Sequence, residues 1–233
     1  MRYKAVFFDA GETLVHAHPS FAELFANVVS RAGHQVNAEA IAESISEKAA
    51  ARLERAAGKN ELWSTDRERS KTFWLGIYGA LLEETGLPAD QGLDVKLYEA
   101  FSDHANYSLF PDVERVLEKL GSSGLILGVI SNFEEWLEVL LEHLDIARYF
   151  SVTAISGIEG VEKPDPSLFR IALSRGGVDA GDAIYVGDNP RFDVDPAAAV
   201  GMHAVLLDRR GRFQGVDTPR ISSLEELPAM AGI

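Results

Sequence analysis

The sequence predicts an α/β fold with a parallel sheet, covered by helices and interrupted once by a helical insertion. Five short apolar runs alternate with segments of helical periodicity, which is the pattern of successive βαβ units. Short unbroken apolar runs are typical of strands that are buried on both faces. The stretch between the first two runs, roughly ninety residues, contains no convincing strand and is too long for a simple crossover.

The first predicted strand covers residues 5–8 and runs directly into Asp9. The other predicted strands cover residues 125–130, 151–155, 183–186 and 203–207. Right-handed crossovers bring the carboxyl ends of parallel strands to one edge of the sheet. In open α/β sheets that edge is where ligands bind. We therefore expect Asp9 to leave the core at a binding edge.

The insertion, residues 16–107, is predicted to form four helices with recognisable start signals. The capping residues are Ser20 with Glu23, Asn37, and Thr65 with Glu68. The second helix is expected to stop at Gly58, and the fourth to run from Asp90 to near Asn106. The domain division that follows is a helical domain over 16–107 and a core domain over 1–15 and 108–233.

The core domain is predicted to contain five further helices between and after its strands. Four of them are expected at about residues 111–124, 133–143, 166–175 and 224–230. The other follows the strand at 183–186 and ends at residue 200. Pro111 and Pro166 suit the first helical turn. Ser222 or Ser223 is expected to cap the last helix.

Composition excludes several classes of partner. The chain has 233 residues, a net charge of −14 and a pI of about 4.8, which argues against binding to nucleic acid or to anionic membranes. No apolar run approaches the roughly 20 residues of a membrane span. The absence of cysteine excludes disulfides and thiolate metal sites. With no signal peptide expected ahead of the first strand, we expect a cytoplasmic protein.

Polar side chains follow several predicted strands, where parallel connectivity gathers them at one rim. They are Asp9, Ser131, Asn132, Lys163, Asp188 and Asp193. Carboxylates without a cysteine or histidine cluster form a hard oxygen site that suits Mg²⁺. A serine hydroxyl and a lysine ammonium supply donors for a phosphoryl group, and an aspartate beside Mg²⁺ can act as a nucleophile.

Each of these residues also has a simpler explanation when taken alone. Asp9 could cap a turn, Ser131 could cap the following helix, and Lys163 could be a solvated loop residue. Asp188 and Asp193 could be a turn residue and a surface charge. All of them occur in order and at the correct position relative to a strand, and this coincidence favours a catalytic site.

In this ordered set the chain resembles the haloacid dehalogenase (HAD) superfamily, in its phosphatase-rich branch with a helical cap. Residues 9–13 resemble the first motif of that family and Ser131-Asn132 the second. Lys163-Pro164 resembles the third motif, and Gly187-Asp188 with Asp193 the fourth. The resemblance implies a Rossmann-like sheet of five strands in the order 5-4-1-2-3, with the insertion as a cap domain.

The resemblance also implies a role for each motif residue. Asp9 would be the nucleophile and a Mg²⁺ ligand, with the Gly11 carbonyl as a second ligand. Asp188 would hold the metal directly or through water, and Asp193 would support it. The substrate would be a small phosphorylated metabolite. The resemblance leaves open whether the protein is a monomer or a homodimer.

Three residues would handle the phosphoryl group. Ser131 would bind the transferring oxygens, and Asn132 would help to orient them. Lys163 would offset the charge of both the nucleophile and the phosphoryl group.

The chain departs from the family pattern at Gly11. HAD phosphatases usually carry a second aspartate there, which protonates the leaving oxygen and then activates water. Such general acid–base help is typically worth about 10²–10⁴-fold in rate. Glu12 is one residue out of register, so its side chain is expected to point elsewhere unless the turn is rearranged. His16 and His18 could supply a proton, although loop or cap-hinge positions are the simpler explanation for both.

Side chains of the insertion offer a substrate pocket, with packing and solvation as the alternatives. The aromatic candidates are Trp63, Phe73, Trp74 and Tyr78, and the candidates for an anionic tail are Arg67 and Arg69. Three functions remain open. The leading one is a Mg²⁺-dependent phosphatase that forms an aspartyl-phosphate. The others are a metal-independent haloacid dehalogenase and a catalytically weak binding or regulatory protein on a HAD scaffold.

Overall fold

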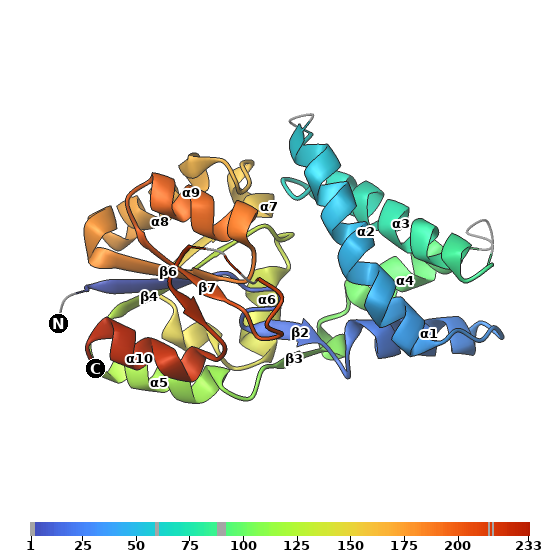
Figure 1. Cartoon of the computed structure of the whole chain (residues 1–233), viewed down its shortest axis with the longest axis horizontal. Helices are drawn as coiled ribbons and strands as arrows, with labels where there is room; N and C mark the ends of the chain where they lie inside the picture. Colours follow the sequence, from blue (N-terminus) through green and yellow to red (C-terminus); the bar gives the residue numbers. More distant parts are fainter. Residues whose placement is uncertain (1–2, 59–60, 88–91, 214, 216) are drawn as a thin grey trace. The chain divides into compact units, whose positions relative to one another are not determined.

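The structure is a computed structural model that describes residues 3–58, 61–87, 92–213, 215 and 217–233 (Figure 1). The chain forms two compact units. One contains Met1–Val15 and Leu109–Ile233 and is called here the sheet unit. The other contains His16–Ser108 and is called the helical unit. Among the described residues, no helix combines the length and the apolar character that crossing a membrane requires.

A six-stranded parallel sheet forms the centre of the sheet unit, in the order β5-β4-β1-β6-β7-β8. The strands are β1 (Ala5–Phe8), β4 (Ile126–Ser131), β5 (Val152–Ile155), β6 (Ala183–Gly187), β7 (His203–Leu207) and β8 (Arg220–Ile221). Phe8 pairs with Val129 on one side and with Val186 on the other. This register brings the residues after β1, β4 and β6 to the same edge. The predicted α/β class is confirmed.

The strand order differs from the predicted 5-4-1-2-3 because the sheet has a sixth strand. Strand β8 lies at the edge beside β7, where Leu206 and Leu207 pair with Arg220 and Ile221. A strand of two residues is too short to show an alternating or unbroken apolar pattern, so the sequence gives no signal for it.

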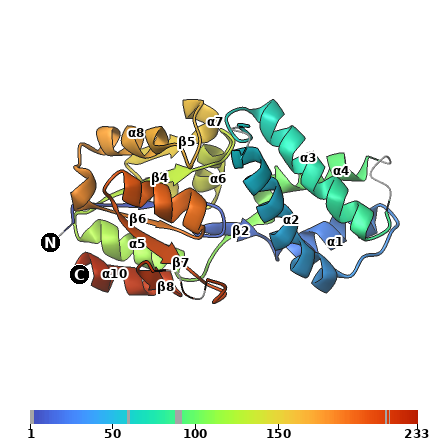
Figure 2. The same ribbon diagram turned by 45° about the horizontal axis from the view of Figure 1, so that its top comes forward.

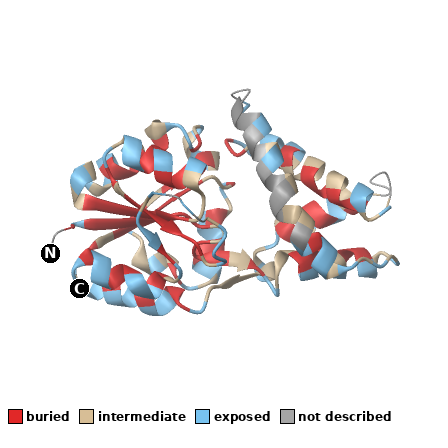
Figure 3. Ribbon diagram, viewed as in Figure 1, coloured by how far each residue is buried: buried red, intermediate tan, exposed pale blue. Residues whose placement is uncertain are grey.

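Helices cover both faces of this sheet (Figures 1 and 2). They are α5 (Val113–Ser122), α6 (Leu137–His143), α7 (Ser156–Glu159), α8 (Pro166–Gly176), α9 (Asp195–Ala199) and α10 (Leu227–Ala231). Figure 1 shows α8 and α9 on one face and α5 and α10 on the other. Central strands β1 and β6 are completely buried, as expected for unbroken apolar runs (Figure 3).

Helix α6 begins at Leu137, not at the predicted Phe133. The Phe133 N–H donates to Ser156 Oγ at 2.9 Å, and its carbonyl accepts from the Gly157 N–H at 3.0 Å. These bonds tie the segment after β4 to the start of α7. The first residues of the predicted helix therefore form a loop.

The helical unit contains α1 (Phe21–Arg31), α2 (Ala38–Gly58), α3 (Arg67–Glu84) and α4 (Leu93–Phe101). Its core combines aliphatic side chains with a group of aromatic rings. The Phe21 ring stacks on Phe101 at 4.4 Å between centroids, and Tyr78 stacks on Phe101 at 5.3 Å. Tyr78 therefore belongs to this core, as the packing interpretation of the aromatic residues expects.

Most predicted helix starts in this unit are correct. Ser20 Oγ accepts from the Glu23 N–H, and Asn37 Oδ1 accepts from the Glu39 N–H. Helix α3 is capped by Asp66 and not by the predicted Thr65, because Asp66 Oδ1 accepts from the Arg69 N–H at 2.9 Å. The predicted start of the fourth helix, Asp90, lies outside the described residues.

Two short strands, β2 (Val15–Ala17) and β3 (Tyr107–Leu109), form a separate two-stranded sheet where the chain passes between the units. The His18 N–H donates to the Asn106 carbonyl at 2.8 Å, and the Phe110 N–H donates to the Leu14 carbonyl at 3.1 Å. The prediction of no strand between His16 and Tyr107 is therefore wrong. Three-residue strands are too short to stand out from a loop in the sequence.

Candidate active site

Five predicted site residues meet at the carboxyl edge of the sheet. Asp9 directly follows β1, and Ser131 is the last residue of β4. Lys163 lies in the loop that follows α7. Asp188 directly follows β6, and Asp193 lies in the π-helical turn Pro190–Val194. All of them belong to the sheet unit.

The Asp9 carboxylate is held by two donors. Ser131 Oγ donates to Asp9 Oδ1 at 2.9 Å, and Lys163 Nζ donates to the same oxygen at 2.8 Å. Among the described residues, both of these bonds use Oδ1, which leaves Oδ2 for another ligand. The side chain is 10% exposed, so it is buried but open at one side.

Lys163 is buried among three oxygen atoms. Its ammonium donates to Asp9 Oδ1 at 2.8 Å, to Asp193 Oδ1 at 2.6 Å and to the Tyr185 hydroxyl at 3.0 Å. An ammonium has three donors, and these partners use all of them. Burial lowers the pKa of Lys163, but the charges of Asp193 and Asp9 outweigh it and raise the pKa above its ordinary value. Lys163 therefore carries a fixed positive charge.

Asp193 is bonded to protein through both carboxylate oxygens. Oδ1 lies 2.6 Å from Lys163 Nζ and 2.7 Å from the Tyr185 hydroxyl, and Oδ2 accepts from the Asn189 N–H at 3.0 Å. Gly187 makes this position possible, since a Cβ there would lie 2.3 Å from the Asp193 carboxyl carbon. Asp193 is thus placed to hold Lys163 as well as to support a metal.

Asp188 is partly buried beside the other carboxylates. Burial raises its pKa well above the ordinary value, and the charges of Asp193, Asp9 and Glu12 add to this effect. Lys163 opposes them only in part. Burial likewise raises the pKa of Asp9, with Asp193 adding to it and Lys163 and Ser131 opposing it.

The three carboxylates fit a divalent cation. Oxygen atoms of Asp9, Asp188 and Asp193 lie within 4.8 Å of one another. Burial is the main cause of the raised pKa values of Asp9 and Asp188, and the neighbouring carboxylate charges, which one lysine balances only in part, add to it. An all-oxygen cluster with excess negative charge is a suitable site for Mg²⁺. The Gly11 carbonyl stays a predicted further ligand.

Asn132 is bonded to the main chain of Lys163. Its Nδ2 donates to the Lys163 carbonyl at 2.8 Å, and its Oδ1 accepts from the Lys163 N–H at 2.7 Å. Both ends of the amide are thus engaged with the Lys163 main chain. Asn132 therefore positions Lys163, and its predicted part in orienting the phosphoryl oxygens stays a prediction.

The turn after Asp9 brings Glu12 closer to the site than its register suggests. Glu12 adopts a left-handed backbone with φ of 56°, and its Oε2 accepts from Arg210 Nη2 at 3.1 Å. Together with Asp188 it lines a small cavity of about 40 Å³. The left-handed backbone at Glu12 is the rearranged turn that the prediction allowed for. At Gly11, a Cβ would meet no described atom within 4 Å.

Tyr185 is a site residue that the sequence analysis missed. Its hydroxyl lies 3.0 Å from Lys163 Nζ and 2.7 Å from Asp193 Oδ1, inside the β6 strand. Burial raises its pKa well above the ordinary value, with the charges of Asp193 and Asp9 adding to it. A hydroxyl in the middle of an otherwise aliphatic strand is the signal that could have identified it, because buried tyrosine hydroxyls need a partner.

The remaining candidates lie in the helical unit. Trp63, Phe73 and Arg69 line a cavity there, whereas Trp74 and Tyr78 stack on each other at 5.9 Å. Arg67 is exposed at the start of α3. His16 Nδ1 lies 2.8 Å from the Ala17 carbonyl, and His18 is exposed. The two histidines stay candidates only.

Residues 3–201 match the family model described as haloacid dehalogenase-like hydrolase. The chain belongs to the haloacid dehalogenase-like hydrolase family. This match includes all the site residues described above. The predicted resemblance is therefore confirmed, and the protein is a HAD-like hydrolase with relatives that are named as phosphatases.

Two curated relatives and one solved structure illustrate the similarity. Haloacid dehalogenase-like hydrolase domain-containing protein 3 of Danio rerio is 30% identical over 96% of this chain and 94% of its own length. Glyceraldehyde 3-phosphate phosphatase of Methanopyrus kandleri is 30% identical over 92% of this chain and 87% of its own. The magnesium-bound HAD-hydrolase YfnB of Bacillus subtilis has a TM-score of 0.80 over 100% of both chains at 19% identity, which shows the shared fold.

Proposed function

We propose that this HAD-like hydrolase is a Mg²⁺-dependent phosphatase of small phosphorylated metabolites that works through an aspartyl-phosphate. The observation that carries the proposal is the environment of Asp9. Its Oδ1 accepts from Ser131 Oγ and Lys163 Nζ, inside a cluster of three carboxylates whose oxygens lie within 4.8 Å of one another. Such a cluster supports a nucleophile, a fixed positive charge and a hard cation at one place.

In the proposed reaction, a free oxygen of the Asp9 carboxylate attacks phosphorus and the bond to the leaving oxygen breaks. Ser131 and Lys163 would redirect to the transferring oxygens the donors that now bind Asp9 Oδ1, while Asp193, Tyr185 and Asn132 hold Lys163 in place. Water then cleaves the aspartyl-phosphate, which releases phosphate and restores the Asp9 carboxylate.

Asp9 and Asp188 would hold the Mg²⁺, with the Gly11 carbonyl and Asp193 in support. The ion would supply neutralisation of charge on the phosphoryl group, which is the main requirement of phosphoryl transfer. The fit rests on the excess negative charge of the carboxylate cluster.

The preferred leaving groups follow from Gly11. Without a second aspartate, the leaving oxygen must depart with little protonation, which costs alkyl phosphates most. We therefore propose aryl or acyl phosphates as better substrates than alkyl phosphates. The helical unit would serve as the cap that selects among them. A cytoplasmic location and a monomeric or homodimeric state stay predictions.

A metal-independent haloacid dehalogenase is the second candidate, and Gly11 favours it because that chemistry uses the aspartate nucleophile without a second acid. The carboxylate cluster at Asp188 argues against it, since a metal site is then not needed. The third candidate is a catalytically weak binding or regulatory protein, which Gly11 also fits because the second aspartate is missing. The intact arrangement of Asp9, Ser131 and Lys163 argues against complete loss of activity.

The test is a panel of small phosphorylated metabolites assayed with Mg²⁺ and with EDTA, using Asp9→Asn as the control. We expect phosphate release that needs Mg²⁺ and disappears in Asp9→Asn. Halide release from a 2-haloacid, unaffected by EDTA, would replace the phosphatase by the dehalogenase. No turnover and no binding of beryllium fluoride by the folded protein would favour the regulatory alternative.

A further inference from the structure

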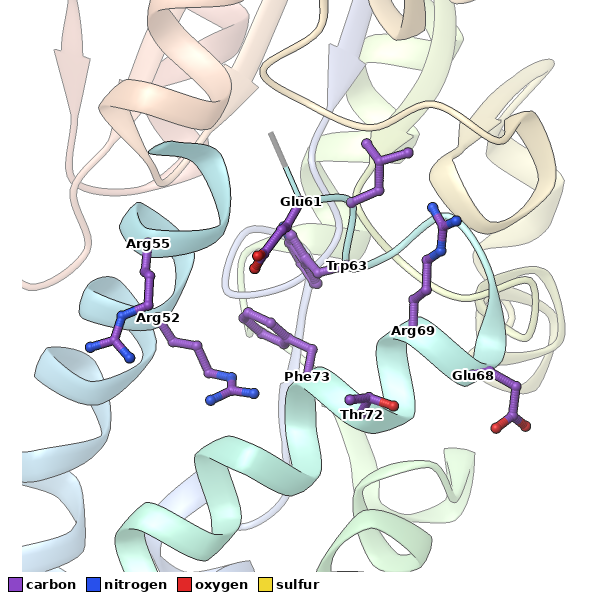
Figure 4. Close-up of a pocket in the computed structure, with 9 residues that line it drawn as sticks. Arg52, Arg55, Glu61, Trp63, Glu68, Arg69, Thr72 and Phe73 are labelled. Carbon is purple, nitrogen blue, oxygen red and sulfur yellow. The ribbon is translucent and has the colours of Figure 1, made fainter. Parts of the chain in front are cut away.

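The helical unit contains a cavity of about 420 Å³ that lies within this unit alone (Figure 4). Helices α2 and α3 and the segment over residues 61–63 line it. Its volume falls within the range of about 300–1,000 Å³ that is usual for small-molecule sites. The cavity is therefore large enough for a small organic molecule.

The lining of this cavity is positively charged, although the chain as a whole is acidic. Arg52, Arg55 and Arg69 face it together with Glu61 and Glu68, a net charge of +1. The whole chain carries −14. A local excess of arginine in an acidic protein attracts anions, and the planar guanidinium group pairs well with carboxylate, sulfonate and phosphate groups.

Arg52 is the least exposed of these cations. It is half-buried, and its Nε has no hydrogen-bond partner among the described residues. Burial lowers the pKa of Arg52 and the neighbouring charge of Arg55 lowers it further, against the charge of Glu61. The positive charge of Arg52 is thus unfavourable in the free protein, and an anion beside it would relieve that cost.

The position of Arg52 depends on a glycine of the facing helix. A Cβ on Gly76 of α3 would lie 2.2 Å from Arg52 Nη2. The guanidinium therefore occupies the space that a side chain at residue 76 would fill. Arg69 contributes less, since its Nε already pairs with Asp66 Oδ2 at 3.0 Å.

An aromatic wall lies beside this cation. The Trp63 and Phe73 rings stack at 4.6 Å between centroids, and the Arg52 guanidinium lies 5.5 Å from the Phe73 centroid. Figure 4 shows Trp63 and Phe73 beside each other, with Arg52 next to Phe73. A flat apolar surface next to an unbalanced arginine suits a ligand that has a ring or chain on one end and an anion on the other.

We propose that this cavity binds a small organic anion, with the charged group on Arg52 and the apolar part against Trp63 and Phe73. The residues that line it belong to the helical unit, whereas the carboxylate cluster belongs to the sheet unit. The proposal concerns binding alone, so it does not depend on whether the protein is a phosphatase.

The test uses the full chain and benzenesulfonate as the probe, with neutral benzenesulfonamide for comparison. Calorimetry gives the affinity, and tryptophan fluorescence reports contact with Trp63. We expect one benzenesulfonate per chain, a change in fluorescence, and binding of benzenesulfonamide at least about tenfold weaker, because a charged hydrogen bond is lost.

Two substitutions act on Arg52 in different ways. Arg52→Gln removes the charge, and Gly76→Ala keeps the charge but displaces the guanidinium. Alanine also suits a helix interior, so α3 is expected to remain folded. Each variant should weaken benzenesulfonate about ten- to hundred-fold. Arg31→Gln, on the exposed end of α1, is the matched control and should leave the affinity unchanged.

Circular dichroism and thermal unfolding check that each variant is folded. Unchanged affinity in folded Arg52→Gln or Gly76→Ala would overturn the proposal, and would show that Arg52 only packs on Phe73. The same conclusion follows if the wild-type chain does not bind the probe at millimolar concentration, or binds the neutral compound equally well. None of these readouts involves turnover, so they are independent of the phosphatase assay.

Discussion

At the scale of single residues, Gly11 would decide how the proposed reaction treats its leaving group. A Cβ at Gly11 would meet no described atom within 4 Å, and its φ is not among the left-handed values that favour glycine. The backbone therefore tolerates a side chain at the position where related phosphatases usually carry an acid. The missing group can be added without rebuilding the turn.

Gly11→Asp is expected to raise kcat for alkyl phosphates by up to about 10²–10⁴-fold, since it supplies a proton donor near the leaving oxygen. Aryl phosphates should gain much less because their leaving groups need less help. The measurement is steady-state kinetics on one alkyl and one aryl phosphate. Gly11→Asn, which has the shape without the proton, is the control, and an equal gain with both variants would refute acid catalysis as the cause.

At the scale of elements, the end of β6 and the turn that follows it shape the site together. Asn189 Oδ1 accepts from the N–H groups of Arg191 and Phe192, which fixes the start of the π-helical turn. That turn places the Asp193 carboxyl against Gly187. A strand end and a short turn thus position the residue that holds Lys163.

Gly187→Ala is expected to lower kcat by at least about 10²-fold and the free energy of unfolding by about 1–3 kcal/mol. The added methyl would lie 2.3 Å from the Asp193 carboxyl carbon, so the carboxyl must move away from Lys163. Kinetics and urea unfolding measure the two effects. Gly181→Ala, where a Cβ meets no described atom within 4 Å, is the control and should behave like the wild type.

The start of α5 is joined to the C-terminal part of the sheet unit through Asp112. This carboxylate, at the start of α5, accepts from both Arg209 Nη atoms at 2.9 Å and from Ser223 Oγ at 2.7 Å. Burial alone would raise the pKa of Asp112, but these bonds, together with one from the Leu224 N–H, lower it. The ionised form therefore stabilises the folded state.

Because the pKa of Asp112 is lower in the folded chain, its stabilising effect is complete above its unfolded pKa of about 3.9 and is lost as the pH falls below that. Asp112→Asn should lower the free energy of unfolding by about 3 kcal/mol at pH 7, with a smaller difference near pH 3. Urea unfolding at both pH values measures this. Glu225→Gln breaks only an exposed pair with Arg115 and should change stability by less than about 1 kcal/mol.

At the scale of the whole molecule, the carboxylate cluster concentrates buried negative charge at one place in a chain whose net charge is −14. The raised pKa values of Asp9 and Asp188 mean that ionising them destabilises the folded state. Without metal, stability should therefore fall as the pH rises above about 4, through the range in which these groups ionise when folded.

Added Mg²⁺ should restore this stability, and its effect should grow as the pH rises because protons then compete less for the carboxylates. At a hundred times the Kd, the expected gain is about 2.7 kcal/mol. Thermal unfolding with Mg²⁺ and with EDTA at several pH values measures it. Asp188→Asn should be more stable than the wild type in EDTA and insensitive to Mg²⁺; an equal response of both proteins would exclude Asp188 from the metal site.

The sequence predicted those elements that have a long or chemically distinct pattern. Unbroken apolar runs identified the central strands, and capping residues such as Ser20 identified helix starts. The features that the sequence did not predict depend on contacts between segments far apart in the chain. The loop before α6 exists because Phe133 bonds to the segment at Ser156, and Asn132 faces the Lys163 main chain because two distant loops meet. Neither contact has a local sequence signal.

The paired strands β2 and β3 have a consequence for how this chain can be re-engineered. They bring the entry and exit of the helical unit together, with the Phe110 N–H bonded to the Leu14 carbonyl. Excising the intervening helices would leave two adjacent ends that a short linker can join. Helices from another member of the family could be grafted at the same junction, so the helical unit can be exchanged while the sheet unit is kept.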